Sequence, residues 1–134
     1  MKEMQRFTEQ FQEEMGWGVS EGSYPETRTS LLGNYMLLTT EVAEVAEELR
    51  KAFNLTRRYV DEGMDEDAAF RLALQNVKED IGKELADCLA YMVKFANFFG
   101  IDMEESFYAK MEEVRHRQNK DAVATGSTPH KNLA

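Results

Sequence analysis

Two acidic motifs with the same spacing mark the parts of this chain that could carry chemistry. The first contains Glu41 and Glu44, and the second contains Glu84 and Asp87. Three residues are nearly one helical turn, so on a helix both carboxylates of a pair lie on the same face. Carboxylate oxygens are ligands that hard divalent cations such as Mg²⁺ prefer. The spacing therefore predicts two helical carboxylate pairs that could share metal ions.

Both pairs lie in segments with the apolar spacing of amphipathic helices. The stripe predicted for the first segment is Leu38, Val42, Val45, Leu49 and Phe53. The stripe predicted for the second is Ile81, Leu85, Cys88, Met92, Phe95 and Phe99. On each helix the carboxylates fall to the same rotational side of the stripe. If the helices pack antiparallel with their stripes facing, the two pairs converge at the rim of the interface.

Convergent carboxylates repel one another and raise one another's pKa values, so they need counter-charge. No lysine or arginine faces the pairs at helical spacing within the two motifs. Mg²⁺ commonly binds a few carboxylates together with waters and substrate phosphates. Glu48 follows the first pair by one turn and Asp80 precedes the second by one turn, so each is a candidate outer ligand or base. The plainer alternative is that all these acids form an ordinary solvent-exposed face.

Taken in order, these motifs resemble those of the MazG-like all-α nucleoside triphosphate pyrophosphohydrolases. Residues 37–44 are similar to the first metal-binding helix of that family. Residues 84–91 are similar to the second, including Tyr91 one turn after the aspartate. An aromatic residue, a lysine and an arginine of a later family helix correspond to Phe107, Lys110 and Arg117. The resemblance covers about residues 5–118, which is most of the chain.

The resemblance implies a Mg²⁺-dependent enzyme that hydrolyses nucleoside or deoxynucleoside triphosphates to the monophosphate and pyrophosphate. It implies two or more Mg²⁺ ions, for which Mn²⁺ could substitute, bound by Glu41, Glu44, Glu84 and Asp87. Glu41, Glu44 and Glu48 are then the catalytic candidates. The spacing alone does not distinguish water attack at the α-phosphorus from attack at the β-phosphorus. A homodimer or a dimer of dimers is also implied, with sites near the subunit interfaces.

Substrate contacts are expected outside the acidic motifs as well. By the resemblance, Lys110 and Arg117 contact phosphates, an aromatic residue of the N-terminal region (Trp17 or Phe11) stacks on the base, and Tyr91 is a further substrate-binding candidate. The chain departs from the family pattern at Val114, where the family often has an asparagine. The phosphate or metal contacts of the last helix therefore stay open. Alternatively, the lysine and arginine pair with neighbouring glutamates, and the tryptophan anchors the core.

Two other functions fit the same residues. The related phosphoribosyl-ATP pyrophosphatases share the helical metal site, although the stretch between Glu44 and Glu84 is longer here than in that compact relative. A non-catalytic helical interaction module is the second alternative. Such a module would need no Mg²⁺ and would tolerate Glu44→Gln and Asp87→Asn, whereas the enzyme would not.

The composition indicates one globular domain. The chain has 134 residues, of which 43% are hydrophobic and 31% are charged, as in soluble proteins. The net charge of −9 argues against a nucleic-acid polymer as partner, but not against a nucleotide bound through metal ions. The single cysteine, Cys88, fits a buried thiol in a reducing cytoplasm. No apolar run approaches the roughly 20 residues that cross a membrane.

The apolar periodicity is helical along the chain, and the strict alternation typical of strands is absent. Helices are predicted over residues 3–15, from 30 to about 53 or somewhat beyond, and over 65–77, 80–99 and 102–119. Ser30, Asp65 and Asp102 are the predicted N-caps, residues 19–29 form a loop, and Gly100 ends a helix. Whether the third and fourth segments are continuous stays open. The prediction is an all-α fold with a pyrophosphohydrolase domain over 1–121 and a flexible tail over 122–134.

Overall fold

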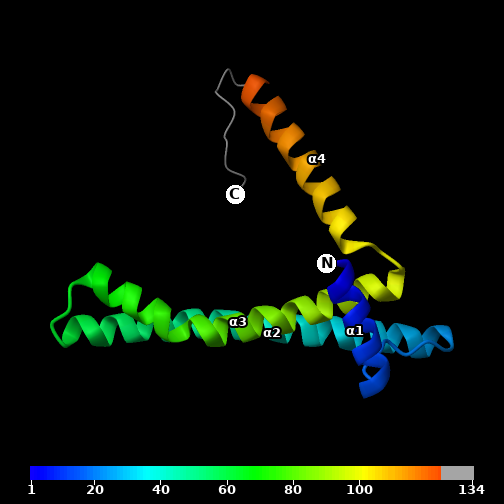
Figure 1. The fold of residues 1–134 in the computed structure, drawn as a ribbon, viewed down its shortest axis with the longest axis horizontal. Helices are drawn as coiled ribbons and strands as arrows, with labels where there is room; N and C mark the ends of the chain where they lie inside the picture. The colour runs from blue at the N-terminus through cyan, green and yellow to red at the C-terminus, as the bar shows by residue number, and fades with distance from the viewer. Residues whose placement is uncertain (125–134) are drawn as a thin grey trace.

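The computed structural model of the chain describes the backbone of residues 1–124 and the side chains of residues 1–118. It contains four helices: α1 (Lys2–Met15), α2 (Tyr24–Asp61), α3 (Glu66–Phe99) and α4 (Met103–Ala124) (Figure 1). No strand occurs in the described part, and the prediction of an all-α fold is confirmed. No helix among the described residues is long and apolar enough to cross a membrane. The last helix continues past its predicted end near residue 119 to Ala124, and so includes the first three residues of the predicted tail (122–134); the rest of that tail lies outside the described residues.

The two longest helices, α2 and α3, form an antiparallel hairpin that makes up most of the molecule (Figure 1). They contain 38 and 34 residues, so each is about 50–60 Å long. A short turn joins them, with Gly63 at a positive φ of 104°, a conformation that suits glycine. Asp65 then caps α3 by accepting a hydrogen bond from the backbone N–H of Ala68 at 3.1 Å. The third and fourth predicted helices, whose continuity the sequence left open, are therefore one unbroken helix.

The predicted start of the second helix at Ser30 is wrong. The helix begins seven residues earlier at Ser23, whose hydroxyl accepts a hydrogen bond from the backbone N–H of Glu26 at 3.4 Å. Pro25, taken as a turn former, stands in the first helical turn, where its missing N–H would have no helical partner. Ser30 lies inside the helix and accepts from the backbone N–H of Ser20. At its other end, predicted at about Phe53 or somewhat beyond, α2 continues to Asp61.

The seam between α2 and α3 contains smaller residues than the predicted stripes. Its core is Ala52, Ala73 and Val77, with Leu55, Tyr59 and Ile81 packed around it. Val42, Leu49 and Phe53, assigned to the buried stripe, are instead 51%, 41% and 57% exposed. Leu85, Met92 and Phe99 of the second stripe are exposed in the same way. The seam is therefore rotated toward the acidic flank of each helix, and large apolar residues remain on the outer faces.

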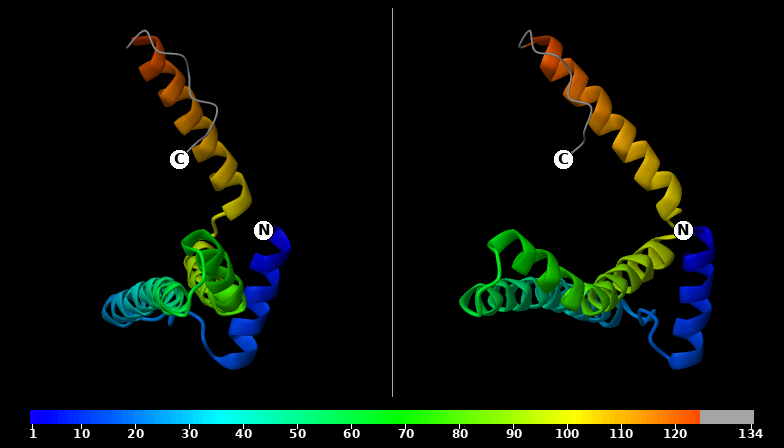
Figure 2. Two further views of the ribbon diagram at one scale, coloured as in Figure 1. Left: turned by 90° about the vertical axis from the view of Figure 1, so that its left-hand side faces the viewer. Right: turned by 60° about the vertical axis from the view of Figure 1, so that its left-hand side comes forward.

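A hydrogen-bonded junction ties α1 to the end of α3. Asn97 Nδ2 donates to the Gln5 carbonyl at 3.0 Å, and Gln5 Nε2 donates to the Ile101 carbonyl at 2.8 Å. Gln5 Oε1 accepts from the backbone N–H of Met103 at 2.9 Å, which fixes the start of α4. Gly100 ends α3 in the left-handed conformation, as predicted. Beyond this junction α4 projects away from the hairpin (Figure 2).

Replacing Ala73 by leucine tests the close packing of the hairpin. Ala73 is fully buried, so the larger side chain should overpack the seam and lower the free energy of unfolding by about 1–3 kcal/mol. Ala43→Leu is the matched control, because Ala43 is an exposed position of α2. Urea denaturation followed by circular dichroism measures both variants. Equal stability of the two variants would contradict this packing.

Candidate metal centre

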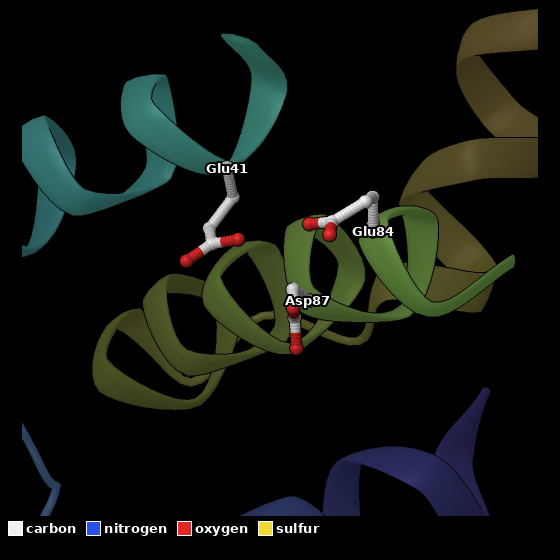
Figure 3. A group of neighbouring side chains, drawn as sticks. All are labelled: Glu41, Glu84 and Asp87. Atoms are coloured by element: carbon white, nitrogen blue, oxygen red, sulfur yellow. The ribbon is translucent and has the colours of Figure 1, made fainter. Parts of the chain in front are cut away.

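Three carboxylates from α2 and α3 converge halfway along the hairpin. Glu41, Glu84 and Asp87 each offer an oxygen that lies within 4.8 Å of the other two. Figure 3 shows the carboxyl groups of Glu41 and Glu84 turned toward each other across the two helices. Glu41 and Glu84 are half-buried and Asp87 is exposed. The group therefore lies at the edge of the seam, open to solvent on one side.

The environment of these carboxylates disfavours negative charge. Burial raises the pKa of Glu41, and the charges of Asp87 and Glu44 raise it further. Burial also raises the pKa of Glu84, as do the nearby charges of Asp87, Glu44 and Glu41. Within residues 1–118, none of these carboxylates forms an ion pair with a lysine or arginine. A divalent cation would supply the missing counter-charge, and an all-oxygen donor set fits Mg²⁺ or Mn²⁺.

Glu44 of the first motif and Glu48, one turn after it, lie in different surroundings. Glu44 is exposed and lies outside the group of three, but its charge contributes to the raised pKa of Glu84. Glu48, expected at the rim, is buried in the seam with only 8% of its side chain exposed. Its Oε1 accepts a hydrogen bond from Lys51 Nζ at 2.9 Å. Its Oε2 has no hydrogen-bond partner among the described residues.

A cavity of about 470 Å³ opens beside the carboxylates at the α1 end of the hairpin. Glu41 and Asp87 form part of its wall, and Trp17 and Tyr91 line it with aromatic surface. Trp17 is 56% exposed and packs edge-on against Phe11 with ring centroids 5.5 Å apart. The tryptophan is therefore not a core anchor in this structure. An aromatic wall next to an anionic cluster suits a ligand with a flat ring at one end and cation-bound phosphates at the other.

Two residues of this cavity, Gln12 and Lys94, were not predicted from the sequence. Lys94 Nζ lies 5.5 Å from the centroid of the Tyr91 ring, and burial lowers the pKa of Lys94. A lysine between Met92 and Phe95 interrupts an apolar run, a signal that could have identified it. Gln12 is buried on α1, and its sequence neighbours give no comparable signal.

Lys110 and Arg117 lie on α4, the helix that projects away from the hairpin (Figure 2). Lys110 Nζ is 3.2 Å and Arg117 Nη2 is 3.4 Å from Oε1 of Glu113. The two cations lower the pKa of Glu113, and the hydrogen bond from Lys110 is the largest cause. Within one chain, these residues therefore show the surface pairing that the sequence left as the alternative. The structure does not bring them to the three carboxylates.

Comparison with known proteins identifies the family of the chain. Residues 29–121 match the family model described as the MazG nucleotide pyrophosphohydrolase domain. The matched region includes α3 and most of α2, and with them all three converging carboxylates. Comparisons with curated proteins and with solved structures give no significant match. Because the family match covers more than half of the sequence, this chain belongs to the MazG nucleotide pyrophosphohydrolase domain family.

Proposed function

We propose that this protein hydrolyses nucleoside or deoxynucleoside triphosphates, with Mg²⁺, to the monophosphate and pyrophosphate. The observation that carries this proposal is the convergence of Glu41, Glu84 and Asp87 beside a cavity with aromatic walls. Family membership supports the nucleotide substrate and the pyrophosphohydrolase reaction. Mn²⁺ is the expected substitute cation, because carboxylates also suit Mn²⁺.

Each part of the site has a separate role in this reaction. Glu41, Glu84 and Asp87 bind the cations, and Glu44 completes the donor set from the exposed side. Mg²⁺ held by these carboxylates would supply counter-charge for the phosphates and would lower the pKa of the attacking water. Trp17 and Tyr91 hold the base by stacking, which is sequence-tolerant because every base has a π-face. Lys94 supplies positive charge at the base end of the cluster.

A second copy of the chain is part of the proposal. The apolar residues Val42, Leu49 and Phe53 lie exposed on α2, and the described residues of α4 project away from the hairpin (Figure 1). Exposed apolar surface of this kind favours self-association. In a homodimer or a dimer of dimers, Lys110 and Arg117 would reach a site only from the α4 of another subunit.

Turnover of the eight common ribo- and deoxynucleoside triphosphates with Mg²⁺ tests the reaction directly. Monophosphate and pyrophosphate should appear in equal amounts, and Glu84→Gln should lower kcat by about 100-fold or more because a cation ligand is lost. Glu79→Gln is the control, since Glu79 is an exposed residue of the same helix that pairs with Lys83. Turnover by Glu84→Gln at the wild-type rate would contradict the proposed site. If no triphosphate is hydrolysed, the phosphoribosyl-ATP and interaction-module alternatives replace it.

The raised pKa values predict how the stability of the metal-free protein depends on pH. The pKa values of Glu41 and Glu84 are raised in the folded protein from an ordinary value of 4.5. Such an acid contributes its full share to the stability of the fold at a pH below 4.5, where it is protonated in both the folded and the unfolded states. That contribution is lost as the pH rises through the folded-state value. Glu84→Gln should therefore gain stability relative to wild type between pH 4 and pH 7. Thermal unfolding without metal measures this difference, and a constant difference across that pH range would contradict it.

The same melting curves test the cation. Mg²⁺ should raise the Tm of the wild type at pH 7, because binding to the folded state alone stabilises it. The Tm of Glu84→Gln should rise much less. An equal rise in both proteins would mean that the ion binds elsewhere.

Removing the Trp17 ring tests the base end of the site. Trp17→Ala should raise KM by about tenfold with little change in kcat, because stacking of an aromatic side chain on a base contributes about 1–3 kcal/mol. Phe7→Ala is the control, because Phe7 is an exposed aromatic residue of α1 that stacks on Phe11 but does not line this cavity. Steady-state kinetics with the preferred triphosphate measure both. Equal KM values for the two variants would exclude a stacking role for Trp17.

A further inference from the structure

The side-chain amide of Gln12 is buried and has no hydrogen-bond partner among the described residues. Gln12 lies on α1, the helix that crosses the end of α3 (Figure 1), and only 9% of the residue is exposed. Within residues 1–118, none of the side-chain hydrogen bonds involves its amide. A buried amide lowers stability unless a hydrogen bond compensates for its lost hydration. The unpaired amide therefore points to a ligand with hydrogen-bonding groups.

Gln12 and Lys94 together line the part of the base cavity that lies away from the carboxylates. Both residues line the cavity of about 470 Å³ and also a neighbouring cavity of about 350 Å³, so they belong to the wall that the two cavities share. Lys94 follows Asp87 by seven residues, which places its Cα about 10 Å farther along α3. A nucleotide whose phosphates lie at the carboxylates would direct its base toward this wall.

The Gln12 amide is fixed relative to the Trp17 ring. The backbone N–H of Trp17 donates to the carbonyl of Gln12 at 2.8 Å. Gly16 closes this turn with a φ of 67°, a conformation that suits glycine. The amide and the indole therefore belong to one hydrogen-bonded turn, and both line the same cavity. A base stacked on Trp17 has the Gln12 amide available to its edge.

Lys94 adds hydrogen-bond donors to this wall. Its Nζ lies 5.5 Å from the centroid of the Tyr91 ring, which lines the same cavity. Within residues 1–118, Lys94 forms no ion pair. Burial lowers the pKa of Lys94, and no neighbouring carboxylate raises it. An ammonium group donates hydrogen bonds and accepts none, so Lys94 suits an oxygen acceptor on the ligand.

We infer that Gln12 and Lys94 read the edge of the base, and that they favour a base with a ring carbonyl group over adenine. This inference rests on the proposed function. Uracil, thymine, cytosine and guanine each carry a carbonyl oxygen next to a ring nitrogen. Lys94 can donate to that oxygen while the Gln12 amide, which both donates and accepts, pairs with the neighbouring groups. Adenine has no carbonyl oxygen and places an amino donor on its edge, so it leaves the donors of Lys94 without this partner.

Calorimetric titration of the full chain with nucleoside monophosphates and Mg²⁺ tests the inference without turnover. The monophosphates of uridine, cytidine and guanosine should each bind about tenfold more tightly than adenosine monophosphate, the usual effect of one hydrogen bond to a charged group. Lys94→Met should remove most of this difference. Gln12→Met should weaken the binding of the three favoured nucleotides by a similar factor.

Matched variants and a ligand without a base separate base reading from a structural effect. Gln10→Met is the control for Gln12, because Gln10 is an exposed glutamine of α1 that pairs with Glu14. Lys83→Met is the control for Lys94, because Lys83 is an exposed lysine of α3 that pairs with Glu79. Both controls should bind every nucleotide as the wild type does. Ribose phosphate should bind equally to the wild type and to all variants.

Two results would overturn the inference. One is adenosine monophosphate binding to the wild type as tightly as the other nucleotides. The other is a wild-type order of affinities in Lys94→Met together with an equal loss of ribose phosphate binding in Gln12→Met, which would mean that the glutamine only supports the fold. If the wild type hydrolyses triphosphates and either result is found, this inference fails alone. If the wild type hydrolyses none, the proposed function fails and the inference with it.

Discussion

The close approach of α2 and α3 is the constraint on which the rest of the structure depends. Toward the α2–α3 turn the helices meet through Ala52 and Ala73, both fully buried. Small residues allow a short distance between helix axes. The same close approach brings acids on the two helices within 4.8 Å of one another. The carboxylate cluster is therefore a direct consequence of the packing of the hairpin.

This packing concentrates negative charge that the chain does not neutralise at the cluster itself. Like charges and partial burial raise the pKa values of Glu41 and Glu84 together. Lys51 and Lys94 each follow an acid of their own helix by seven residues, so the antiparallel hairpin places them toward opposite ends of the cluster, and Lys51 is paired there with Glu48. A carboxylate centre without its own counter-charge suits a divalent cation and the phosphates that such a cation binds. Family membership and local electrostatics thus favour the same class of ligand.

The surface of the hairpin is as informative as its seam. The largest apolar residues of both predicted stripes, such as Phe53 and Phe99, remain on the outside. Burying such side chains would stabilise an assembly by about 1.5–3 kcal/mol each. Helix α4 is anchored at its start by Gln5, and its described residues project away from the hairpin (Figure 2). A single chain of this length therefore covers only part of its apolar surface.

By itself, the sequence determined the all-α class, the family and the helical carboxylate pairs, because spacing along a helix is a local property. It also placed the helix boundaries at Asp65 and Gly100, where capping chemistry is local too. The tertiary structure alone decided which face of each helix is buried. Each helix has one face with alanines and another with larger apolar residues, and which of them packs in the seam depends on the shape of the facing helix. That choice buried Glu48 and left Val42 exposed. It also separated Lys110 and Arg117 from the acids, because the direction of α4 is set by the Gln5 junction and not by any periodicity in the sequence.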